Sequence, residues 1–479
     1  MNIKDLQKIS PVGFGTSGVR GLVTDMNDYV CYMYTTAFLK HIKINLNDKV
    51  VIAGDLRPST ERIMKAVAKA IDNIGAITVN GGRVPSPAIA NYGIINSLPT
   101  IMVTGSHIPS DRNGIKFTTK DGEITKNDEL KMLSQDITVP VGLFDDNGYF
   151  TEDIVLPSIL EDVKDSYIER YTSVFPSDFL KGYAIAFYSH SSVGRDTLIE
   201  IYKKLGADIK EICRSDEFIP VDTEAIREED EKLADENKHR YDAILSADGD
   251  CDRPLIADEN GRWIRGDILG IFTAKYLNAI GVVAPVSCNT ALEKSNWFVN
   301  IYRTPIGSPY VIAGMNFLTS KEISTVVGYE ANGGFLINTP VNLFEKMLPA
   351  LPTRDPVIVH LAILGTAKKL RITLSELLLF LPKRFTYSDR IKDISREYTI
   401  PMLAELASGK DLNIIINKDK IEDVNLTDGV RFTYKNNDII HLRGSGNAPE
   451  LRCYAESYSE KRAKELVITT LKKIKNPKT

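Results

Sequence analysis

The first third of the chain alternates short apolar segments with amphipathic ones. Residues 50–54, 76–79 and 100–104 are apolar enough for buried strands. After the first of these, apolar residues recur at helical spacing from about Ser59, and Gly75 marks the end of that segment. Strand, helix and strand in this order are typical of βαβ units, so the pattern predicts a largely parallel sheet covered by helices.

The same pattern then begins twice more. In the second unit it predicts strands at 183–188, 208–213 and 242–246 and helices at 194–205 and 223–239. The third unit is expected to begin with a strand at 254–257, followed by a turn at 259–261. A helix at 267–280, strands at 282–287 and 324–327 and a helix at 356–370 complete it. The three units share this pattern without obvious sequence identity.

The last hundred residues follow a different pattern. Strands are predicted at 430–434 and 438–442, joined by the hairpin signal Asn436-Asn437, and a third at 451–456. Ser459 can cap a final amphipathic helix. We therefore expect an α/β protein of three related domains with mixed, largely parallel sheets, followed by a C-terminal α+β domain. The expected boundaries are 1–155, 156–257, 258–373 and 374–479.

Composition narrows the class of protein. A chain of 479 residues with 43% hydrophobic and 25% charged residues is typical of a globular protein with several domains. No apolar run reaches the length of a membrane span, and the N-terminus has no signal-peptide pattern. A net charge of −4 predicts neither a nucleic-acid nor a membrane partner. Five scattered cysteines form no C-x-x-C pair, as in cytoplasmic proteins without disulfides or zinc.

A polar segment follows the predicted strand at 100–104. Ser106 comes just beyond the carboxyl end of that strand, where α/β sheets place reactive groups. The segment lacks the G-x-S-x-G pattern, which argues against a hydrolase triad. Its polar neighbours would suit a serine that handles a phosphate, although a capping serine in an ordinary turn is the alternative. These neighbours are Thr104, His107, Arg112 and Lys116.

Three carboxylates at alternate positions follow the strand at 242–246. Asp248, Asp250 and Asp252 can converge on one hard cation, and Mg²⁺ prefers oxygen ligands. An EF-hand calcium loop is the competing interpretation, because Glu259 falls at the twelfth position. It fails because Arg253 stands at the sixth position in place of glycine and because the flanks are strand-like. A solvated acidic turn is the remaining alternative.

Three further polar segments are less specific indicators of function. Glu330 and Asn332, set among glycines, can offer acceptors and donors to vicinal hydroxyls, or can simply end a strand. Arg443 and Arg452 flank a Gly/Ser/Asn loop between two strands, which can bind an anion or be a plain hairpin loop. The glycine-rich segment 14–21 ends in arginine and glycine, and alone it is a weak signal.

Taken in order, these motifs resemble the α-D-phosphohexomutase superfamily, over the chain from Phe14 to Glu456. Within it, the chain is most similar to bacterial phosphomannomutases and phosphomannomutase/phosphoglucomutase enzymes. The resemblance implies four domains around a central cleft, carrying in turn a phosphoserine loop, a Mg²⁺ loop, a sugar-binding loop and a phosphate-binding loop. It also implies that Ser106 is phosphorylated and that its phosphate binds Mg²⁺ together with Asp248, Asp250 and Asp252.

The resemblance assigns the remaining site residues as well. The phosphoryl-transfer site would be lined by Arg20, His107, Lys116 and Arg253, with His107 and Lys116 as candidates for the general base. Sugar hydroxyls would be held by Glu330 and Asn332, with Gly307 and Ser308 in the third-domain recognition loop. The distal phosphate would be bound by Arg443, Ser445, Gly446, Asn447 and Arg452.

The activity that this implies is interconversion of hexose 6-phosphate and hexose 1-phosphate, with mannose first and glucose second, and hexose 1,6-bisphosphate as activator. Departures from the family pattern at Ile108, Cys251, Asn447 and Ala448 remove no charged group from the reaction centre, whereas those at Pro305, Ser308 and Asn332 concern the sugar. Phosphoglucosamine mutase and metal-dependent sugar phosphatase are the alternatives. A catalytically dead binding protein would be expected to lack Ser106 or an aspartate, and both are kept. We expect a cytoplasmic monomer or homodimer whose partners are small sugar phosphates.

Overall fold

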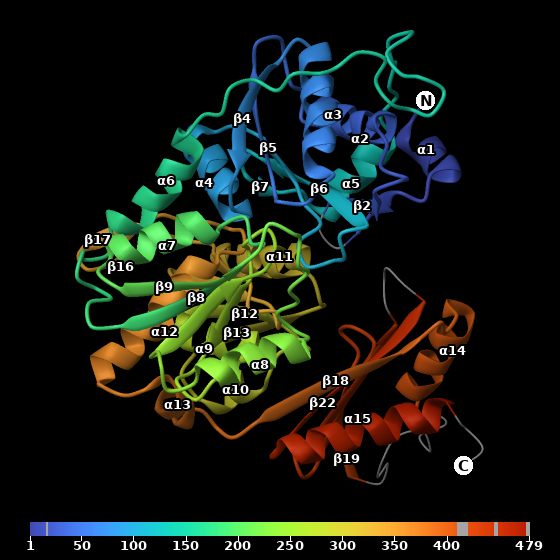
Figure 1. Ribbon diagram of the computed structural model, residues 1–479. Helices are drawn as coiled ribbons and strands as arrows, with labels where there is room; N and C mark the ends of the chain where they lie inside the picture. The colour runs from blue at the N-terminus through green and yellow to red at the C-terminus, as the bar shows by residue number, and fades with distance from the viewer. Residues whose placement is uncertain (16–17, 410–419, 445–448, 476–479) are drawn as a thin grey trace.

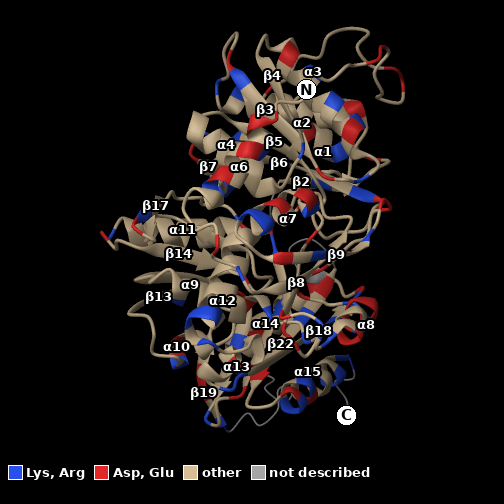
Figure 2. Cartoon of the chain, turned by 60° about the vertical axis from the view of Figure 1, so that its left-hand side comes forward, with Lys and Arg blue, Asp and Glu red and all other residues tan. Residues whose placement is uncertain are grey.

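The computed structural model describes residues 1–15, 18–409, 420–444 and 449–475. The chain forms three consecutive α/β units and a separate C-terminal unit at the lower right of Figure 1. Acidic and basic residues are interspersed over all four units (Figure 2). Among the described residues, no helix combines the length and the apolar character needed to cross a membrane.

The first unit contains a seven-stranded mixed sheet in the order β1-β2-β6-β5-β3-β4, with β7 paired to β6. Strands β3, β4 and β5 are parallel, as predicted, and the other pairings are antiparallel. Val50 and Ile52 of β3 face one hydrophobic cluster while Val51 and Ala53 face another, so helices cover both sides. The strands are β1 (Gly13–Phe14), β2 (Val19–Leu22), β3 (Lys49–Gly54), β4 (Ile77–Arg83), β5 (Thr100–Val103), β6 (Arg112–Thr119) and β7 (Gly122–Glu123). The helices are α1 (Ile3–Ile9), α2 (Asp28–His41), α3 (Thr60–Asn73), α4 (Ser86–Asn96) and α5 (Lys126–Leu133).

The second unit has a four-stranded sheet in the order β11-β10-β8-β9. Its strands are β8 (Ala184–His190), β9 (Asp208–Arg214), β10 (Ala243–Ala247) and β11 (Pro254–Ala257), and its helices are α6 (Asp162–Thr172), α7 (Arg195–Lys204) and α8 (Glu228–Asn237). The sequence pattern assigned the strand at 254–257 to the start of the third unit, and this was wrong. Because the chain turns back after the loop at 248–253, β11 pairs antiparallel with β10 and completes the second sheet.

The third unit has a sheet in the order β13-β12-β14-β15 and a small β16-β17 hairpin. The helix predicted at 267–280 ends earlier, because Asn278 has a φ of 52° that a helix cannot continue. The strands are β12 (Gly281–Pro285), β13 (Asn300–Thr304), β14 (Val326–Tyr329), β15 (Phe335–Ile337), β16 (Val341–Leu343) and β17 (Lys346–Leu348). The helices are α9 (Gly266–Tyr276), α10 (Ala291–Lys294), α11 (Ser308–Thr319), α12 (Pro356–Leu370) and α13 (Leu374–Leu377), followed by the 3-10 turn η1 (Leu378–Phe380).

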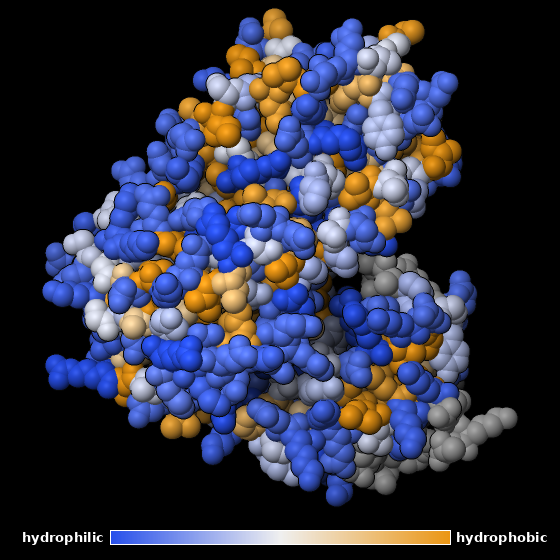
Figure 3. Space-filling view, in the orientation of Figure 1, coloured by the Kyte–Doolittle hydropathy of each residue, from blue (hydrophilic) through white to orange (hydrophobic). Residues whose placement is uncertain are grey.

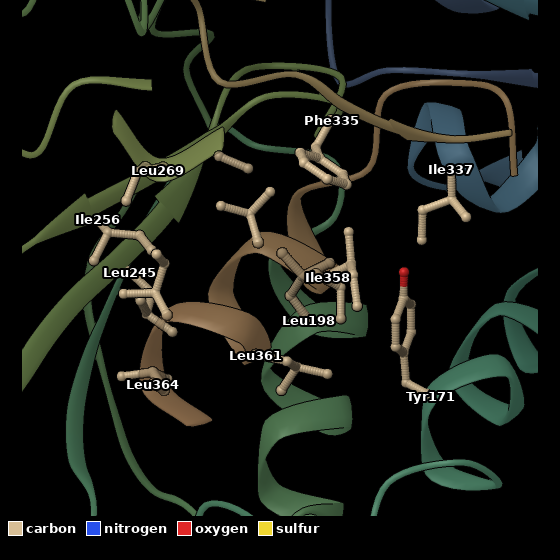
Figure 4. Packing of buried hydrophobic residues seen from close by; sticks show 14 of the residues in the cluster. Tyr171, Leu198, Leu245, Ile256, Leu269, Phe335, Ile337, Ile358, Leu361 and Leu364 are labelled. Atoms are coloured by element: carbon tan, nitrogen blue, oxygen red, sulfur yellow. The ribbon is translucent and has the colours of Figure 1, made fainter. Parts of the chain in front are cut away.

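One hydrophobic cluster runs through the first three units. It includes Val51 of the first sheet, Leu245 of the second and Phe335 of the third. Figure 4 shows how Leu198, Leu245, Phe335 and the α12 side chains Ile358, Leu361 and Leu364 come together in it. The boundaries predicted after residues 155, 257 and 373 fall between the sheets. Because the hydrophobic cluster continues across these positions, the structure does not divide the chain there, and the domain boundaries stay a prediction.

The C-terminal unit is a five-stranded antiparallel sheet in the order β18-β22-β21-β20-β19, packed against two helices. It has a hydrophobic cluster of its own. Asn437, with a φ of 63°, turns the predicted hairpin between β20 and β21. Its elements are β18 (Phe385–Lys392), α14 (Arg396–Ala407), β19 (Ile421–Asn425), β20 (Val430–Tyr434), β21 (Ile439–Gly444), β22 (Glu450–Ser457) and α15 (Glu460–Lys475). The predicted fold class, three α/β units and one α+β unit, is confirmed.

Candidate active site

A cavity of about 300 Å³ lies between the C-terminal unit and the other three. Figure 3 shows the hollow that separates the C-terminal unit from the rest of the molecule. Residues of all four units line it: His107 of the first, Glu224 of the second, Ala331 of the third and Arg452 of the fourth, among others. The cavity is large enough for a small phosphorylated molecule.

Ser106 lies in the loop after β5, next to His107, which lines this cavity. Its backbone is left-handed, with a φ of 55°, and its N–H donates to Thr104 Oγ1 at 2.8 Å. Only 1% of the residue is exposed. Its Oγ donates to Asp248 Oδ2 at 2.6 Å and lies 3.5 Å from His107 Nδ1. The loop therefore presents the serine hydroxyl to the acidic loop of the second unit.

Arg57 holds the serine loop in place. Its guanidinium is fully buried, pairs with Asp55 at 3.1 Å and lies 4.0 Å from the ring of Phe218 in the second unit. Gly105 leaves room for it, because a Cβ there would lie 2.7 Å from the guanidinium carbon. The guanidinium also donates to the carbonyl oxygens of Ser106, Ile108, Pro109 and Arg112, at 2.8, 2.5, 2.6 and 2.9 Å. The loop conformation thus depends on one buried cation.

The predicted metal residues Asp248, Asp250 and Asp252 form one buried cluster in the loop between β10 and β11. One carboxylate oxygen of each lies within 4.8 Å of the others. Asp248 Oδ1 accepts from the backbone N–H groups of Asp252 at 3.0 Å and Arg253 at 3.2 Å. The flanking strands are antiparallel, so the EF-hand alternative, which needs flanking helices, is excluded.

In the other two aspartates, one oxygen is held by donors and the other is not. Asp250 Oδ2 accepts from Ser86 Oγ at 2.6 Å and from Lys116 Nζ at 2.5 Å. Asp252 Oδ2 accepts from Lys116 Nζ at 2.7 Å and pairs with Arg354 Nη2 at 2.9 Å. Within the described residues, Oδ1 of each is buried without a hydrogen-bond partner. This is how outer donors orient a carboxylate toward a metal ion.

Electrostatics favour a cation at the cluster. Burial and the neighbouring charges of Asp250 and Asp252 raise the pKa of Asp248 to about 8. Oxygen ligands of this number and charge, two of them without a hydrogen-bond partner in the described part of the chain, fit a hard divalent cation such as Mg²⁺. Asp248, Asp250 and Asp252 are the residues that would hold it.

The predicted basic residues surround Ser106 and the acidic cluster. Arg253 Nη1 lies 2.9 Å from His107 Nδ1, and since a guanidinium only donates, this nitrogen accepts. Burial, together with Arg253 and Arg20, holds the pKa of His107 far below its usual range. Burial also lowers the pKa of Arg20, to about 10, assisted by Arg253. For Lys116 burial acts in the same direction, but Asp250 and Asp252 outweigh it and the pKa is raised.

The predicted sugar loop is a tight turn after β14. Glu330 is 5% exposed, and its Oε2 lies 3.4 Å from Arg354 Nη1. Asn332 uses its side-chain oxygen to accept from the Gly334 N–H at 2.9 Å, and its carbonyl accepts from Thr223 Oγ1 at 2.7 Å. In this conformation the side-chain oxygen of Asn332, a residue expected to hold sugar hydroxyls, stabilises the turn instead.

The predicted recognition loop at the start of α11 contacts two other units. Gly307 has a φ of 133°, and Ser308, which is fully buried, donates to Glu123 Oε2 of the first unit at 3.3 Å. The backbone N–H of Ile306 donates to Asp428 Oδ2 of the C-terminal unit at 2.9 Å. Ser308 thus faces Glu123 and is not among the residues that line the cavity.

Arginines stand in one row across the C-terminal sheet. Arg452 on β22 is directly opposite Arg443 on β21 and Arg390 on β18. Like charges in this arrangement repel, so a bound anion would stabilise them. Arg443 Nε pairs with Asp428 at 3.0 Å, while the buried Nε of Arg452 has no hydrogen-bond partner within the described part of the chain. The other predicted residues of this loop, Ser445, Gly446 and Asn447, lie outside the described residues.

The structure adds residues that the sequence did not single out. Arg57, Ser86 and Arg354 each touch a predicted residue directly, and Asp428 links Arg443 to the loop at Ile306. Arg57 follows β3 at the sheet edge where Ser106 also lies, a position that could have indicated it. The other contacts depend on tertiary structure alone.

Comparison with known proteins agrees with the fold. Family models for phosphoglucomutase/phosphomannomutase match as alpha/beta/alpha domain I at residues 11–139, alpha/beta/alpha domain III at 265–385 and C-terminal domain at 401–471. A phosphomannomutase of Salmonella muenchen is 45% identical over 481 residues, covering 99% of this chain and 98% of the relative.

Two solved structures are similar in fold. A phosphoglucomutase/phosphomannomutase family protein from Burkholderia thailandensis has a TM-score of 0.71 at 18% identity, covering 96% of this chain and 97% of that one. The Aspergillus fumigatus N-acetylphosphoglucosamine mutase, in complex with GlcNAc-6P and magnesium, has a TM-score of 0.61 at 13% identity, covering 100% and 98%.

Fold and sequence similarity together define a phosphotransferase of the mutase type, a phosphohexomutase. The chain belongs to the phosphoglucomutase/phosphomannomutase family. The predicted resemblance is confirmed.

Proposed function

We propose that this enzyme interconverts hexose 6-phosphate and hexose 1-phosphate, with mannose phosphates as the preferred substrates. The observation that carries the proposal is the pairing of two sites. Ser106 Oγ lies 2.6 Å from Asp248 and is adjacent in sequence to His107, which lines the cavity, and Arg390 and Arg452 of the arginine row line the same cavity from the C-terminal unit. A mutase must hold one phosphate while the other reacts, whereas a phosphatase needs a single phosphate site.

The proposed reaction begins with Ser106 phosphorylated. The bond between Oγ and phosphorus breaks as a sugar hydroxyl attacks, giving hexose 1,6-bisphosphate. After the bisphosphate has turned around, its other phosphate returns to Oγ and the product leaves with one phosphate. Such transfer depends on placement and on neutralised charge more than on a strong nucleophile.

The surrounding residues fit these steps. Lys116, Arg253 and Arg20 supply positive charge to the phosphoryl oxygens. His107, whose Nδ1 lies 3.5 Å from Ser106 Oγ, and Lys116 are the two candidate bases for the hydroxyl proton. Mg²⁺ bound by the acidic cluster would neutralise phosphoryl charge. The magnesium and GlcNAc-6P bound to the Aspergillus fumigatus relative support both the metal and the class of substrate.

The choice of mannose and the sugar contacts are proposed from similarity to relatives and from the loops at 304–309 and 330–334. The name of the Salmonella muenchen relative supports mannose. Glu330 and Asn332 are proposed to hold sugar hydroxyls and Gly307 and Ser308 to shape the recognition loop, with Arg443, Arg452 and the loop at 445–447 holding the distal phosphate. Asn332 would act through its amide nitrogen, because its oxygen is bound to Gly334.

The test is a substrate panel. Purified enzyme is given Mg²⁺, a trace of hexose 1,6-bisphosphate and, separately, the 1-phosphates of mannose, glucose and glucosamine. We expect 6-phosphate to form fastest from mannose 1-phosphate, with no net release of inorganic phosphate. Accumulation of inorganic phosphate without any 6-phosphate would contradict the proposal and favour the phosphatase.

A further inference from the structure

Arg354 joins two loops that come from different sheets. It is 3% exposed. Its Nη2 lies 2.9 Å from Asp252 Oδ2 in the acidic loop after β10, and its Nη1 lies 3.4 Å from Glu330 Oε2 in the turn after β14. One planar guanidinium therefore contacts a carboxylate of each loop. It does so through two different nitrogens at a fixed spacing, which a single ammonium nitrogen does not provide.

The backbone that carries Arg354 is rigidly held. Asp355 caps α12, accepting from the Val357 N–H at 3.0 Å, and its own N–H donates to the Phe335 carbonyl at 3.0 Å. The hydroxyls of Tyr167, at 2.7 Å, and of Tyr171 donate to the same carboxylate from α6. Arg354 therefore projects from a fixed point.

The glycine-rich turn leaves a path for this side chain. A Cβ at Gly334 would lie 2.5 Å from Arg354 Cδ, so no larger residue fits beside it. The guanidinium reaches Asp252 at Oδ2, the oxygen that also accepts from Lys116 at 2.7 Å. Oδ1 of Asp252 lies 3.6 Å from Arg253 Nε and is buried without a hydrogen-bond partner in the described residues, so the cationic groups on Oδ2 orient this second oxygen.

We propose that Arg354 is a positioning residue that couples sugar binding at Glu330 to metal binding at Asp252. The inference rests on the proposed function, in which Glu330 binds a sugar hydroxyl and Asp252 binds Mg²⁺. A hydroxyl bound to Glu330 fixes the guanidinium, and the guanidinium in turn fixes Asp252. Coupling of this kind is reciprocal, so Mg²⁺ and sugar phosphate raise each other's affinity by one common factor.

The experiment measures that factor at equilibrium. In the Ser106→Ala protein, which cannot transfer phosphate, the Kd of mannose 1-phosphate is measured calorimetrically with and without Mg²⁺, and the Kd of Mg²⁺ with and without the sugar phosphate. We expect a coupling factor of about 10. Adding Arg354→Lys should bring the factor close to 1 and weaken binding of Mg²⁺ alone by about 10-fold or more.

A matched control separates coupling from general damage. Arg195 is also a buried arginine, donating to the carbonyls of His190 at 2.7 Å and Ser215 at 2.5 Å, and it contacts neither loop. Arg195→Lys should leave the coupling factor unchanged. Glu330→Gln, which breaks the other end of the bridge, should lower the factor while leaving the affinity for Mg²⁺ alone as it was.

Two results would overturn the inference. One is an unchanged coupling factor in either Arg354→Lys or Glu330→Gln, and if Arg354→Lys does not fold, Glu330→Gln decides alone. The other is an unchanged affinity of folded Arg354→Lys for Mg²⁺ alone, a measurement that requires no sugar. Failure of the proposed function looks different, because the wild-type enzyme would then convert none of the sugar phosphates in the panel.

Discussion

Replacing Arg57 by lysine tests how the reactive serine is held. The guanidinium donates to four carbonyl groups of the loop 106–112 and to Asp55, all inside the protein. Lysine keeps a positive charge beside Asp55, so no buried carboxylate is left unpaired. Its three donors on one atom cannot reach carbonyls on both sides of the loop. We therefore expect the variant to fold with a loosened serine loop.

The size of the effect follows from the lost contacts. A hydrogen bond to a charged group contributes about 1.5–3 kcal/mol, so losing two of the five costs about 3–6 kcal/mol of local stability. If Ser106 then moves by about 1 Å, kcat should fall by about 100-fold. KM should change far less, because the sugar and distal phosphate contacts lie elsewhere.

Steady-state kinetics and thermal unfolding measure the two effects separately. Arg62→Lys is the control: Arg62 on α3 donates to Asp28 Oδ1 at 2.7 Å and to the Met26 carbonyl at 2.8 Å, in the same unit but in contact with none of the site residues that the structure describes. It should lose stability and keep kcat within about twofold. A kcat for Arg57→Lys within about threefold of wild type, or an equal fall in the control, would refute the reasoning.

Further predictions concern the same site. Ser106→Ala should abolish turnover while calorimetry still detects sugar-phosphate binding; residual full activity would exclude a covalent role. Chelation with EDTA should remove activity and lower the thermal midpoint, since Asp248, Asp250 and Asp252 would repel one another, and added Mg²⁺ should restore both; activity that persists after EDTA would contradict the metal site. Gly249→Ala places a Cβ 2.7 Å from the Ser106 carbonyl and should cost about 1–3 kcal/mol in unfolding experiments, which an unchanged midpoint would disprove.

The sequence predicted best those elements whose ends carry a local signal, such as a capping residue or a proline. The helix at 356–370 matches α12 at both ends, because Asp355 caps it and Pro356 begins it, and Arg371, with a φ of 58°, ends it. The helix predicted at 223–239 is shorter, covering Glu228–Asn237. Charge and periodicity could not show that Thr223 lies outside the helix, where its hydroxyl donates to the Asn332 carbonyl of the third unit.

The site was predictable to the extent that its residues follow strands directly. Ser106 and Asp248 meet because the loops after β5 and β10 contact each other, and the sequence places each group at a strand end. Ser86 and Arg354 were missed because their partners are remote: Ser86 bonds Asp250, 164 residues away. Asn332 lies in the turn after β14 and Ser308 at the start of α11, where a local hydrogen bond to Gly334 and a tertiary contact with Glu123 occupy them.

The central claim, that Ser106 carries the transferred phosphoryl group, has one direct measurement. Enzyme is incubated briefly with hexose 1,6-bisphosphate that is labelled in its phosphates. One portion is digested, and the labelled peptide is identified by mass spectrometry. A second, intact portion is chased with unlabelled mannose 1-phosphate. We predict label on the peptide containing Ser106 and its complete transfer to sugar phosphate in the chase. Label on another residue, or its release as inorganic phosphate, would contradict the account.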